Sequence, residues 1–279
     1  MVPPAEAKRT QPEMLAVHDR LGPCEQRLEG NRHGLPTVAI VGASYTAGVG
    51  PGVSTLSWAA DLARMLHWNA VIYGDPGAGY VSRGGSDLGP VIRLLTAERL
   101  RDLAPSLVII QAGHDDAGVA TPIERQAVIR AIEEVRARAP RARIALLTVF
   151  TRPRTSQWLT YYRTDQAIVT AARAADHTSI IMDPLTGRWR FTHFHGSGLH
   201  PTAAGDADIA RRVYALLRAH GIRASSAATA AVTCQVAVGV GLGPDAAPGT
   251  ARDALTATAG PAYPAGPGLR RRRPLPESA

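Results

Sequence analysis

Five short apolar runs recur along the chain, and helical spacing follows each of them. The runs are rich in β-branched residues and are bounded by turn-forming residues, which is typical of buried strands. They span residues 37–41, 70–73, 107–110, 144–149 and 179–182. Because buried strands that alternate with helices form parallel sheets, the pattern predicts an α/β domain with helices on both faces of a five-stranded sheet.

The segments around these runs predict six helices, at residues 12–21, 54–67, 88–103, 121–139, 161–175 and 201–219. The fourth helix has the clearest start. Thr121 offers a hydroxyl N-cap, Pro122 suits the first turn, and Glu124 stands where a capping box needs it. Pro140 then ends the helix.

Composition divides the chain into three segments. Residues 1–35 are polar and contain proline, so we expect an N-terminal extension. Residues 36–222 carry all five strands and form the expected domain. Residues 223–279 are rich in Ala, Thr, Gly and Pro, and this low-complexity composition predicts a disordered C-terminal tail.

The formal charge of +8 invites a nucleic-acid partner, but the distribution of the charge argues against one. Four of the positive charges are the consecutive Arg270 to Arg273 in the tail, and the others are scattered over helix faces. Cys24 and Cys234 are too few for a disulfide framework or a metal motif. We therefore expect neither a nucleic acid nor a metal as partner.

The N-terminus, MVPPAEAKRTQPEML, lacks the apolar core of a secretory signal. Residues 227–243 carry no charge, but they are only moderately apolar and make a poor membrane span. The default expectation is therefore a cytoplasmic protein without a membrane span.

Candidate chemistry gathers where the predicted strands end. Ser44 follows the first strand, and loops rich in Gly, Asp or His follow the strands that end near residues 73, 110 and 182. The carboxyl ends of parallel strands meet at one edge of a sheet, where ligands bind. Ser44 is thus a candidate nucleophile, although serine is also an ordinary turn residue.

Four blocks in this order resemble the SGNH (GDSL-like) hydrolase family over residues 37–220. They are G-A-S-Y-T-A-G at 42–48, G-D-P-G at 74–77, G-H-D-D at 113–116, and G-L-H-P-T-A-A-G at 198–205. The resemblance implies a three-layer αβα sandwich with a flavodoxin-like parallel sheet. It also implies a serine hydrolase that cleaves carboxylic esters through an acyl-enzyme without a cofactor. The ester would be an acyl lipid, an acetylated sugar or another small ester, and relatives of this kind are often secreted.

The same resemblance assigns roles to single residues. Ser44 matches the nucleophile and His200 the general base. The backbone amides of Ser44 and Gly77 match two donors of the oxyanion hole, and Asp115 stands at the position of its third donor, an asparagine. Such donors and such a base are what an unaided serine hydroxyl lacks.

Three positions depart from the family pattern. Ala43 replaces an aspartate before the nucleophile, at a position that is mostly structural. Asp115 replaces the oxyanion asparagine, and an ionised carboxylate 4 Å from the oxyanion would cost about 4 kcal/mol at an effective dielectric of 20. Asp115 is therefore either protonated or turned away, in which case His114 is an alternative donor.

The third departure is Ser197, which stands where the triad acid is expected, three residues before His200. Asp183, at the end of the fifth strand, and Asp206 are the nearest other acids in the sequence. A Ser–His dyad oriented by Ser197, by Asp183 or by a backbone carbonyl remains open.

Two other functions compete with the esterase. A binding protein on the same fold would fit the weakened chemistry implied by Asp115 and Ser197. A metal-dependent phosphoesterase would use His193, His195 and the aspartate pair, but their order matches no established metal motif. The glycine loop at residues 74–79 lacks the nucleotide-binding pattern, so we expect no cofactor.

Overall fold

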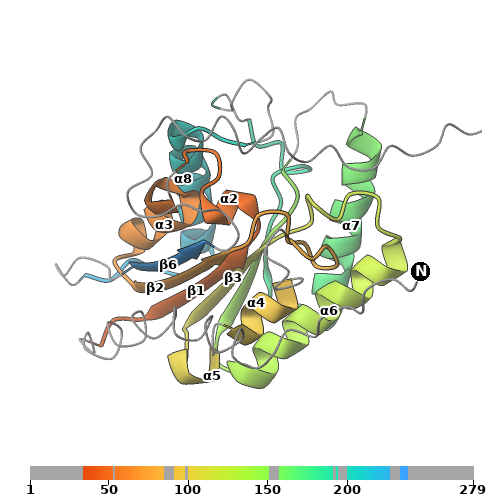
Figure 1. The fold of residues 1–279 in the computed structure, drawn as a ribbon. Helices are drawn as coiled ribbons and strands as arrows, with labels where there is room; N and C mark the ends of the chain where they lie inside the picture. The colour runs from red at the N-terminus through yellow and green to blue at the C-terminus, as the bar shows by residue number, and fades with distance from the viewer. Residues whose placement is uncertain are drawn as a thin grey trace, which may run out of the picture. The chain divides into compact units, whose positions relative to one another are not determined.

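A parallel sheet forms the middle layer of the fold (Figure 1). Among the described residues the strand order is β5-β4-β3-β1-β2-β6, and every neighbouring pair is parallel. The strands are β1 (Thr37–Gly42), β2 (Asn69–Gly74), β3 (Leu107–Gln111), β4 (Arg143–Leu147), β5 (Ile180–Met182) and β6 (Thr233–Ala237). The first five are the predicted strands, and their order is that of a flavodoxin-like sheet.

The computed structural model describes residues 34–52, 54–84, 91–97, 100–150, 157–190, 193, 200–226 and 233–237. All of them belong to the unit Met1–Pro244. The predicted helix at residues 12–21 and Cys24 lie outside this set, as do His195, Ser197 and most of the expected tail.

Residues 233–237 correct the expectation for the tail, because they form strand β6 instead of a disordered segment. This strand pairs with β2 at the edge of the sheet, from Ala70 with Thr233 to Gly74 with Ala237. The run T-C-Q-V-A is short and lies in an Ala- and Gly-rich stretch, so its strand preference does not stand out in the sequence.

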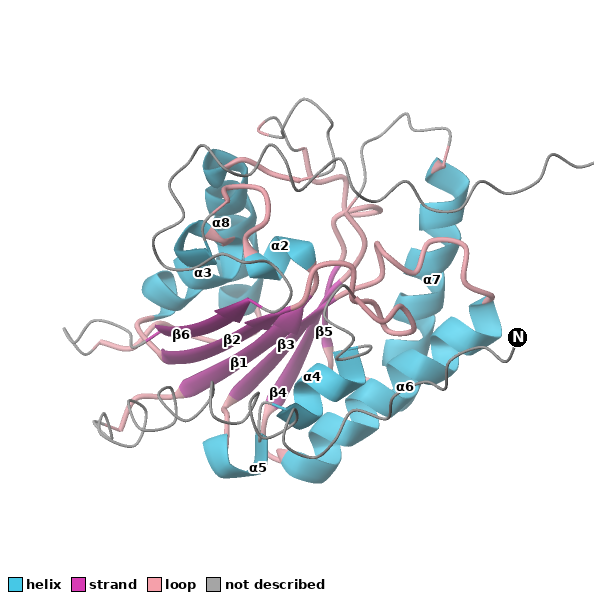
Figure 2. Ribbon diagram, viewed as in Figure 1, coloured by secondary structure: helices cyan, strands magenta, loops and turns pink. Residues whose placement is uncertain are grey.

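Helices cover both faces of the sheet (Figure 2). Helices α3 and α8 pack together on one face, and α4, α6 and α7 pack on the other. The helices are α2 (Ser44–Ala47), the 3-10 turn η1 (Ser54–Leu56), α3 (Trp58–Leu66), α4 (Val91–Ala97), α5 (Leu100–Leu103), α6 (Thr121–Arg138), α7 (Trp158–Ala175) and α8 (Ala203–Ala219). This confirms the predicted three-layer αβα sandwich.

The alternation of side chains along β1 divides the core between the two faces. Val38 and Ile40 belong to the cluster under α3 and α8, whereas Ala39 and Val41 belong to the cluster under α4, α6 and α7. All four side chains are fully buried, as expected for a central strand of a parallel sheet.

Three helix boundaries differ from the prediction. The helix expected from Ser54 begins at Trp58, because Ser57 accepts a hydrogen bond from the Ala60 amide at 3.3 Å and serves as the N-cap. The expected helix at 88–103 contains the separate helices α4 and α5. At α6 the predicted capping box is wrong: Ala120 is the N-cap, and Glu124 is buried instead of reaching back to it.

No helix in the described ranges is long and apolar enough to cross a membrane.

Candidate active site

The candidate site lies at the carboxyl edge of the sheet, where β1 and β3 are neighbours. The chain leaves β1 toward β2 and leaves β3 toward β4, so the strand order reverses between these two strands. A crevice forms at such a switch point. Ser44 follows β1 and residues 113–116 follow β3, while helix α2 sits at this edge of the sheet (Figure 2).

A tight turn presents Ser44 as the first residue of α2. A Cβ atom at Gly42 would collide with Thr46 Oγ1 and with the Gln111 carbonyl, so only glycine fits before the turn. Gly48 ends α2 in the left-handed region with φ of 78°. The turn is therefore set by two glycines, as the sequence block suggested.

Gln111, the last residue of β3, holds this turn from the neighbouring strand. Its Oε1 accepts the Ala43 amide at 3.2 Å and the Thr46 hydroxyl at 2.9 Å. Gln111 is fully buried. No local pattern in the sequence marks Gln111, because its partners lie more than 60 positions away.

His200 lies beside Ser44, the predicted nucleophile, with its Nε2 atom 2.9 Å from Ser44 Oγ. The Ser44 side chain is only 8% exposed, and the imidazole is half-buried. The backbone next to the histidine is fixed on two sides. A Cβ at Gly50 would collide with the Pro201 carbonyl, and the Thr202 amide donates to the His193 carbonyl at 2.9 Å.

Gly77 occupies the turn after β2 with φ of 82°, a conformation that favours glycine. Within the described part of the chain its amide makes no hydrogen bond. The Ser44 amide is the first of α2 and has no partner within the helix. Both amides are thus available to an oxyanion.

Asp116 joins the loop after β3 to the loop after β2. Its buried carboxylate accepts backbone N–H groups from Tyr80 at 2.6 Å, Val81 at 3.2 Å and Ser82 at 2.8 Å. The Ser82 hydroxyl adds a 2.7 Å hydrogen bond to the Asp115 carbonyl. These bonds connect the segment that carries Gly77 to the segment that carries Asp115.

Asp115 reaches solvent at the rim of this junction. Partial loss of solvation, together with the nearby carboxylates of Asp116 and Asp75, raises the pKa of its carboxyl to about 6. Its carboxyl group is therefore neutral in a larger fraction of molecules than an ordinary aspartate at neutral pH.

His114 is constrained to one role. Its Nδ1 lies 2.9 Å from the Phe150 carbonyl, and burial lowers the pKa of the ring, which keeps the imidazole neutral. A neutral imidazole that donates from Nδ1 has only an acceptor left at Nε2. The alternative in which His114 replaces the oxyanion asparagine is therefore disfavoured.

Aromatic rings surround the Ser44–His200 pair. Tyr45 stacks on Phe150 with ring centroids 4.8 Å apart and lies 5.7 Å from the His200 ring. His114 stacks on Tyr161 at 4.8 Å. These rings give the site an apolar side next to His200.

The two alternative acids from the sequence already have other partners. Asp183 accepts the Thr186 amide at 2.8 Å and the Thr186 hydroxyl. Asp206 is fully buried and accepts the Trp58 amide at 3.0 Å, which ties α8 to the start of α3. Neither carboxylate is hydrogen-bonded to His200, and Ser197 lies outside the described residues.

The described residues contain no group of three or more His, Cys, Asp or Glu side chains arranged to hold a metal ion. His193 is exposed, and His195 lies outside the residues that the structure describes.

The sequence profile of the GDSL-like Lipase/Acylhydrolase family matches residues 40–207. The chain belongs to this family. The match begins within β1 and ends within α8, so it covers both Ser44 and His200. As a GDSL-like hydrolase the chain is a carboxylic ester hydrolase, which confirms the resemblance found in the four sequence blocks.

Solved structures of similar fold include two esterases and a protein of the G-D-S-L family. A carbohydrate esterase family 2 enzyme with a carbohydrate-binding domain from Corynascus thermopiles (Myceliophthora fergusii) has a TM-score of 0.54 and 20% identity, over 67% of this chain and 67% of that chain. A protein of the G-D-S-L lipolytic family from Desulfitobacterium hafniense has a TM-score of 0.53 and 20% identity, over 65% of this chain and 99% of that chain. The psychrotrophic esterase EstA from Pseudoalteromonas has a TM-score of 0.51 and 16% identity, over 66% of this chain and 97% of that chain.

At these identities the structural likeness shows a shared fold. No protein of curated function matches the sequence of this GDSL-like hydrolase.

Proposed function

We propose that this GDSL-like hydrolase cleaves small carboxylic esters through an acyl-enzyme, with Ser44 as the nucleophile and His200 as the general base. The observation that carries the proposal is the 2.9 Å separation of Ser44 Oγ and His200 Nε2. This distance allows the hydroxyl to donate its proton to the imidazole as it attacks, which is the geometry that serine hydrolysis needs.

The reaction then proceeds in two halves. Ser44 Oγ attacks the ester carbonyl while its proton moves to His200 Nε2, and a tetrahedral oxyanion forms. The imidazolium returns this proton to the leaving alcohol oxygen, and the C–O bond of the ester breaks. Water next attacks the acyl-enzyme with His200 again taking a proton, and the carboxylic acid leaves as Ser44 regains its hydrogen.

The amides of Ser44 and Gly77 are the proposed donors to the oxyanion. Each such donor contributes about 3 kcal/mol of transition-state stabilisation in serine hydrolases. Asp115 adds a third donor in its neutral form, whereas its carboxylate opposes the oxyanion. The group that orients His200 in this proposal is Ser197 or a backbone carbonyl instead of an acid, because Asp183 and Asp206 are engaged elsewhere.

The ester is an acyl lipid, an acetylated sugar or another small ester. The fold is shared with a carbohydrate esterase and with a G-D-S-L lipolytic protein, so both classes of ester belong in a substrate panel. A series of p-nitrophenyl esters from acetate to dodecanoate, together with acetylated xylan, separates the three classes by their kcat/KM values.

Phosphonate labelling tests the mechanism directly. The EstA structure is of an enzyme inhibited by monoethylphosphonate, which makes a fluorophosphonate a suitable probe. We expect the probe to label wild-type enzyme at Ser44, and Ser44→Ala to lose both labelling and hydrolysis of p-nitrophenyl acetate. Ser106→Ala is the matched control, because Ser106 is an exposed serine at the opposite edge of the sheet, just before β3.

Three results would contradict the serine mechanism. Unchanged turnover by Ser44→Ala would remove the nucleophile from the mechanism, and full binding of substrate without turnover in the wild type would favour the binding-protein alternative. Loss of activity on chelation would favour the metal-dependent phosphoesterase.

A further inference from the structure

Glu124 is a buried carboxyl group that the capping-box pattern does not explain. It lies in the first turn of α6 and is 1% exposed. The ionised form of Glu124 would be unsatisfied, because neither carboxyl oxygen has a hydrogen-bond donor among the described residues. Burial and the neighbouring carboxylate of Asp116 raise the pKa of Glu124 to about 9, so the side chain is a neutral acid at neutral pH.

As a neutral acid, Glu124 has one proton to share, and the acceptor beside it is Asp116. The Asp116 carboxylate already accepts the three amides of residues 80–82. A fourth hydrogen bond, from Glu124, fits the capacity of a carboxylate, which has about four acceptor positions. The result is a buried carboxyl–carboxylate pair that holds one proton between α6 and the loop after β2.

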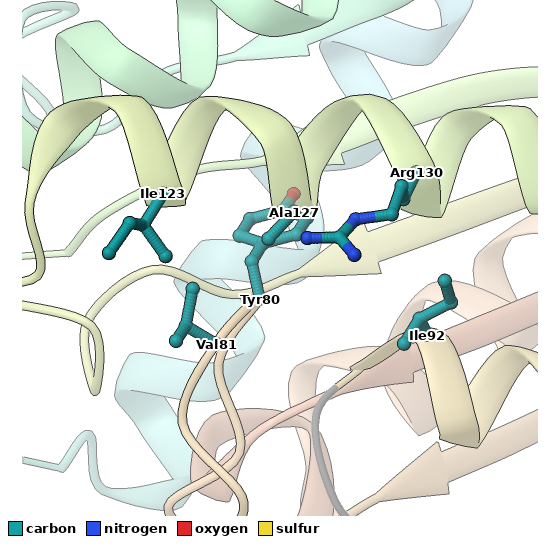
Figure 3. A pocket seen from close by; sticks show the side chains of 6 residues that line it. All are labelled: Tyr80, Val81, Ile92, Ile123, Ala127 and Arg130. Carbon is teal, nitrogen blue, oxygen red and sulfur yellow. The ribbon is translucent and has the colours of Figure 1, made fainter.

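Besides these hydrogen bonds, the loop packs through Tyr80, whose side chain is buried in the core on this face of the sheet. A cavity of about 230 Å³ separates the loop from α6 and α4, as Figure 3 shows. It is lined by Tyr80, Val81, Ile92, Ile123, Ala127 and Arg130. The Tyr80 hydroxyl has no hydrogen-bond partner in the described part of the chain. Residues 80–82 are held through their amides by Asp116 and through the buried ring of Tyr80, and they stand three to five positions beyond Gly77.

We propose that Asp116 and Glu124 form a one-proton brace that positions the Gly77 loop for oxyanion binding, and that loss of the shared proton releases the loop. The inference rests on the proposed function, because it takes the Gly77 amide as an oxyanion donor. Asp116 and Glu124 are positioning residues, since they act on the reaction through the loop.

The physical basis of the release is repulsion between like charges. When Glu124 loses its proton, two carboxylates face each other in a buried site beside the Tyr80 phenol. Asp115 adds negative charge next to Asp116, and Asp75 lies close enough to act on Asp115. The pair separates, Asp116 withdraws from the amides of residues 80–82, and Gly77 loses its fixed position.

The test compares pH–rate profiles of three proteins with p-nitrophenyl acetate between pH 6.5 and 10. For the wild type we expect kcat to fall at least fivefold above a midpoint near pH 9, with KM changed less than twofold. Glu124→Gln keeps a donor toward Asp116 and has no proton to lose. We expect it to retain kcat within threefold at pH 7.5 and to lack this alkaline limb. Glu133→Gln, an exposed carboxylate on the same helix, is the matched control and keeps the wild-type profile.

Asp116→Asn tests the other member of the pair. It weakens the bonds to the three amides at every pH, and we expect kcat to fall at least tenfold at pH 7.5 while KM changes less than threefold. Circular dichroism and thermal melting of each protein at pH 7.5 and 9.5 separate this local effect from unfolding.

Several outcomes would overturn the brace. For the wild type, these are a kcat that stays level to pH 10 and global unfolding at the midpoint of the alkaline limb. For the variants, they are an alkaline limb in Glu124→Gln equal to that of the wild type and full kcat in a folded Asp116→Asn protein. Failure of the serine mechanism is distinct, because the wild type would then resist fluorophosphonate labelling of Ser44 at pH 7.5.

Discussion

Replacing Asp115 by asparagine should make this hydrolase faster, by a factor that depends on pH. Asp115 stands at the position of an oxyanion donor, and its pKa is raised to about 6. Only the neutral carboxyl group can donate a hydrogen bond to the oxyanion, and this form disappears as the pH rises through the pKa. Asparagine donates at every pH.

The size of the gain follows from the neutral fraction of Asp115. With a pKa of about 6, this fraction is about a half at pH 6, roughly one tenth at pH 7 and roughly one hundredth at pH 8. The kcat of Asp115→Asn relative to the wild type should therefore be about 2, 10 and 100 at these three pH values. An oxyanion donor is worth roughly 10² to 10³ in kcat, which sets the ceiling.

The assay is the ratio of the two kcat values for p-nitrophenyl acetate, measured in the same buffers from pH 6 to 8. The ratio removes the titration of His200, because both proteins share this base. Glu133→Gln again serves as control and should give a ratio near one throughout. A ratio for Asp115→Asn that does not change with pH, or that falls below one at pH 8, would show that the carboxyl group does not face the oxyanion.

Three further predictions follow from other contacts. Gln111→Leu removes the acceptor for the Ala43 amide and the Thr46 hydroxyl, so we expect kcat to fall at least tenfold and urea unfolding to show a loss of about 1–3 kcal/mol. Burial raises the pKa of Asp206 to about 8, so the folded protein holds a proton there that the unfolded chain has already lost. The free energy of unfolding of the wild type, measured in urea, should therefore fall between pH 5 and 8. Asp206→Asn should lose less stability over the same range. Ser197→Asp supplies the acid that the family motif has three residues before the base, and a gain in kcat is expected; an unchanged kcat would show that another group already orients His200.

The sequence was sufficient where the signal is local. Each of the five strands is a continuous apolar run, and the two faces of β1 follow from simple alternation of Val38, Ala39, Ile40 and Val41. Ser44 and His200 lie in blocks whose neighbours also match, so the pair could be named although 156 positions separate its members.

The parts that escaped prediction depend on contacts between distant segments. Glu124 has the spacing of a capping box, but burial beside Asp116 decides its side-chain position instead. Gln111 and Asp116 act on turns that belong to other strands, and nothing in their own neighbourhood reveals this. Asp183 and Asp206 are candidate acids in the sequence because they are near His200, but their carboxyl groups accept hydrogen bonds from backbone amides elsewhere.

The order of the catalytic pair along the chain has a consequence for biosynthesis. Ser44 is made early, just after the first strand of the sheet, whereas His200 follows only after β5 and lies shortly before α8. A growing polypeptide that has completed β1 to β4 therefore carries a serine without a base to take its proton. In the proposed mechanism, Ser44 gains its base only when the segment around Pro201 packs against Gly50.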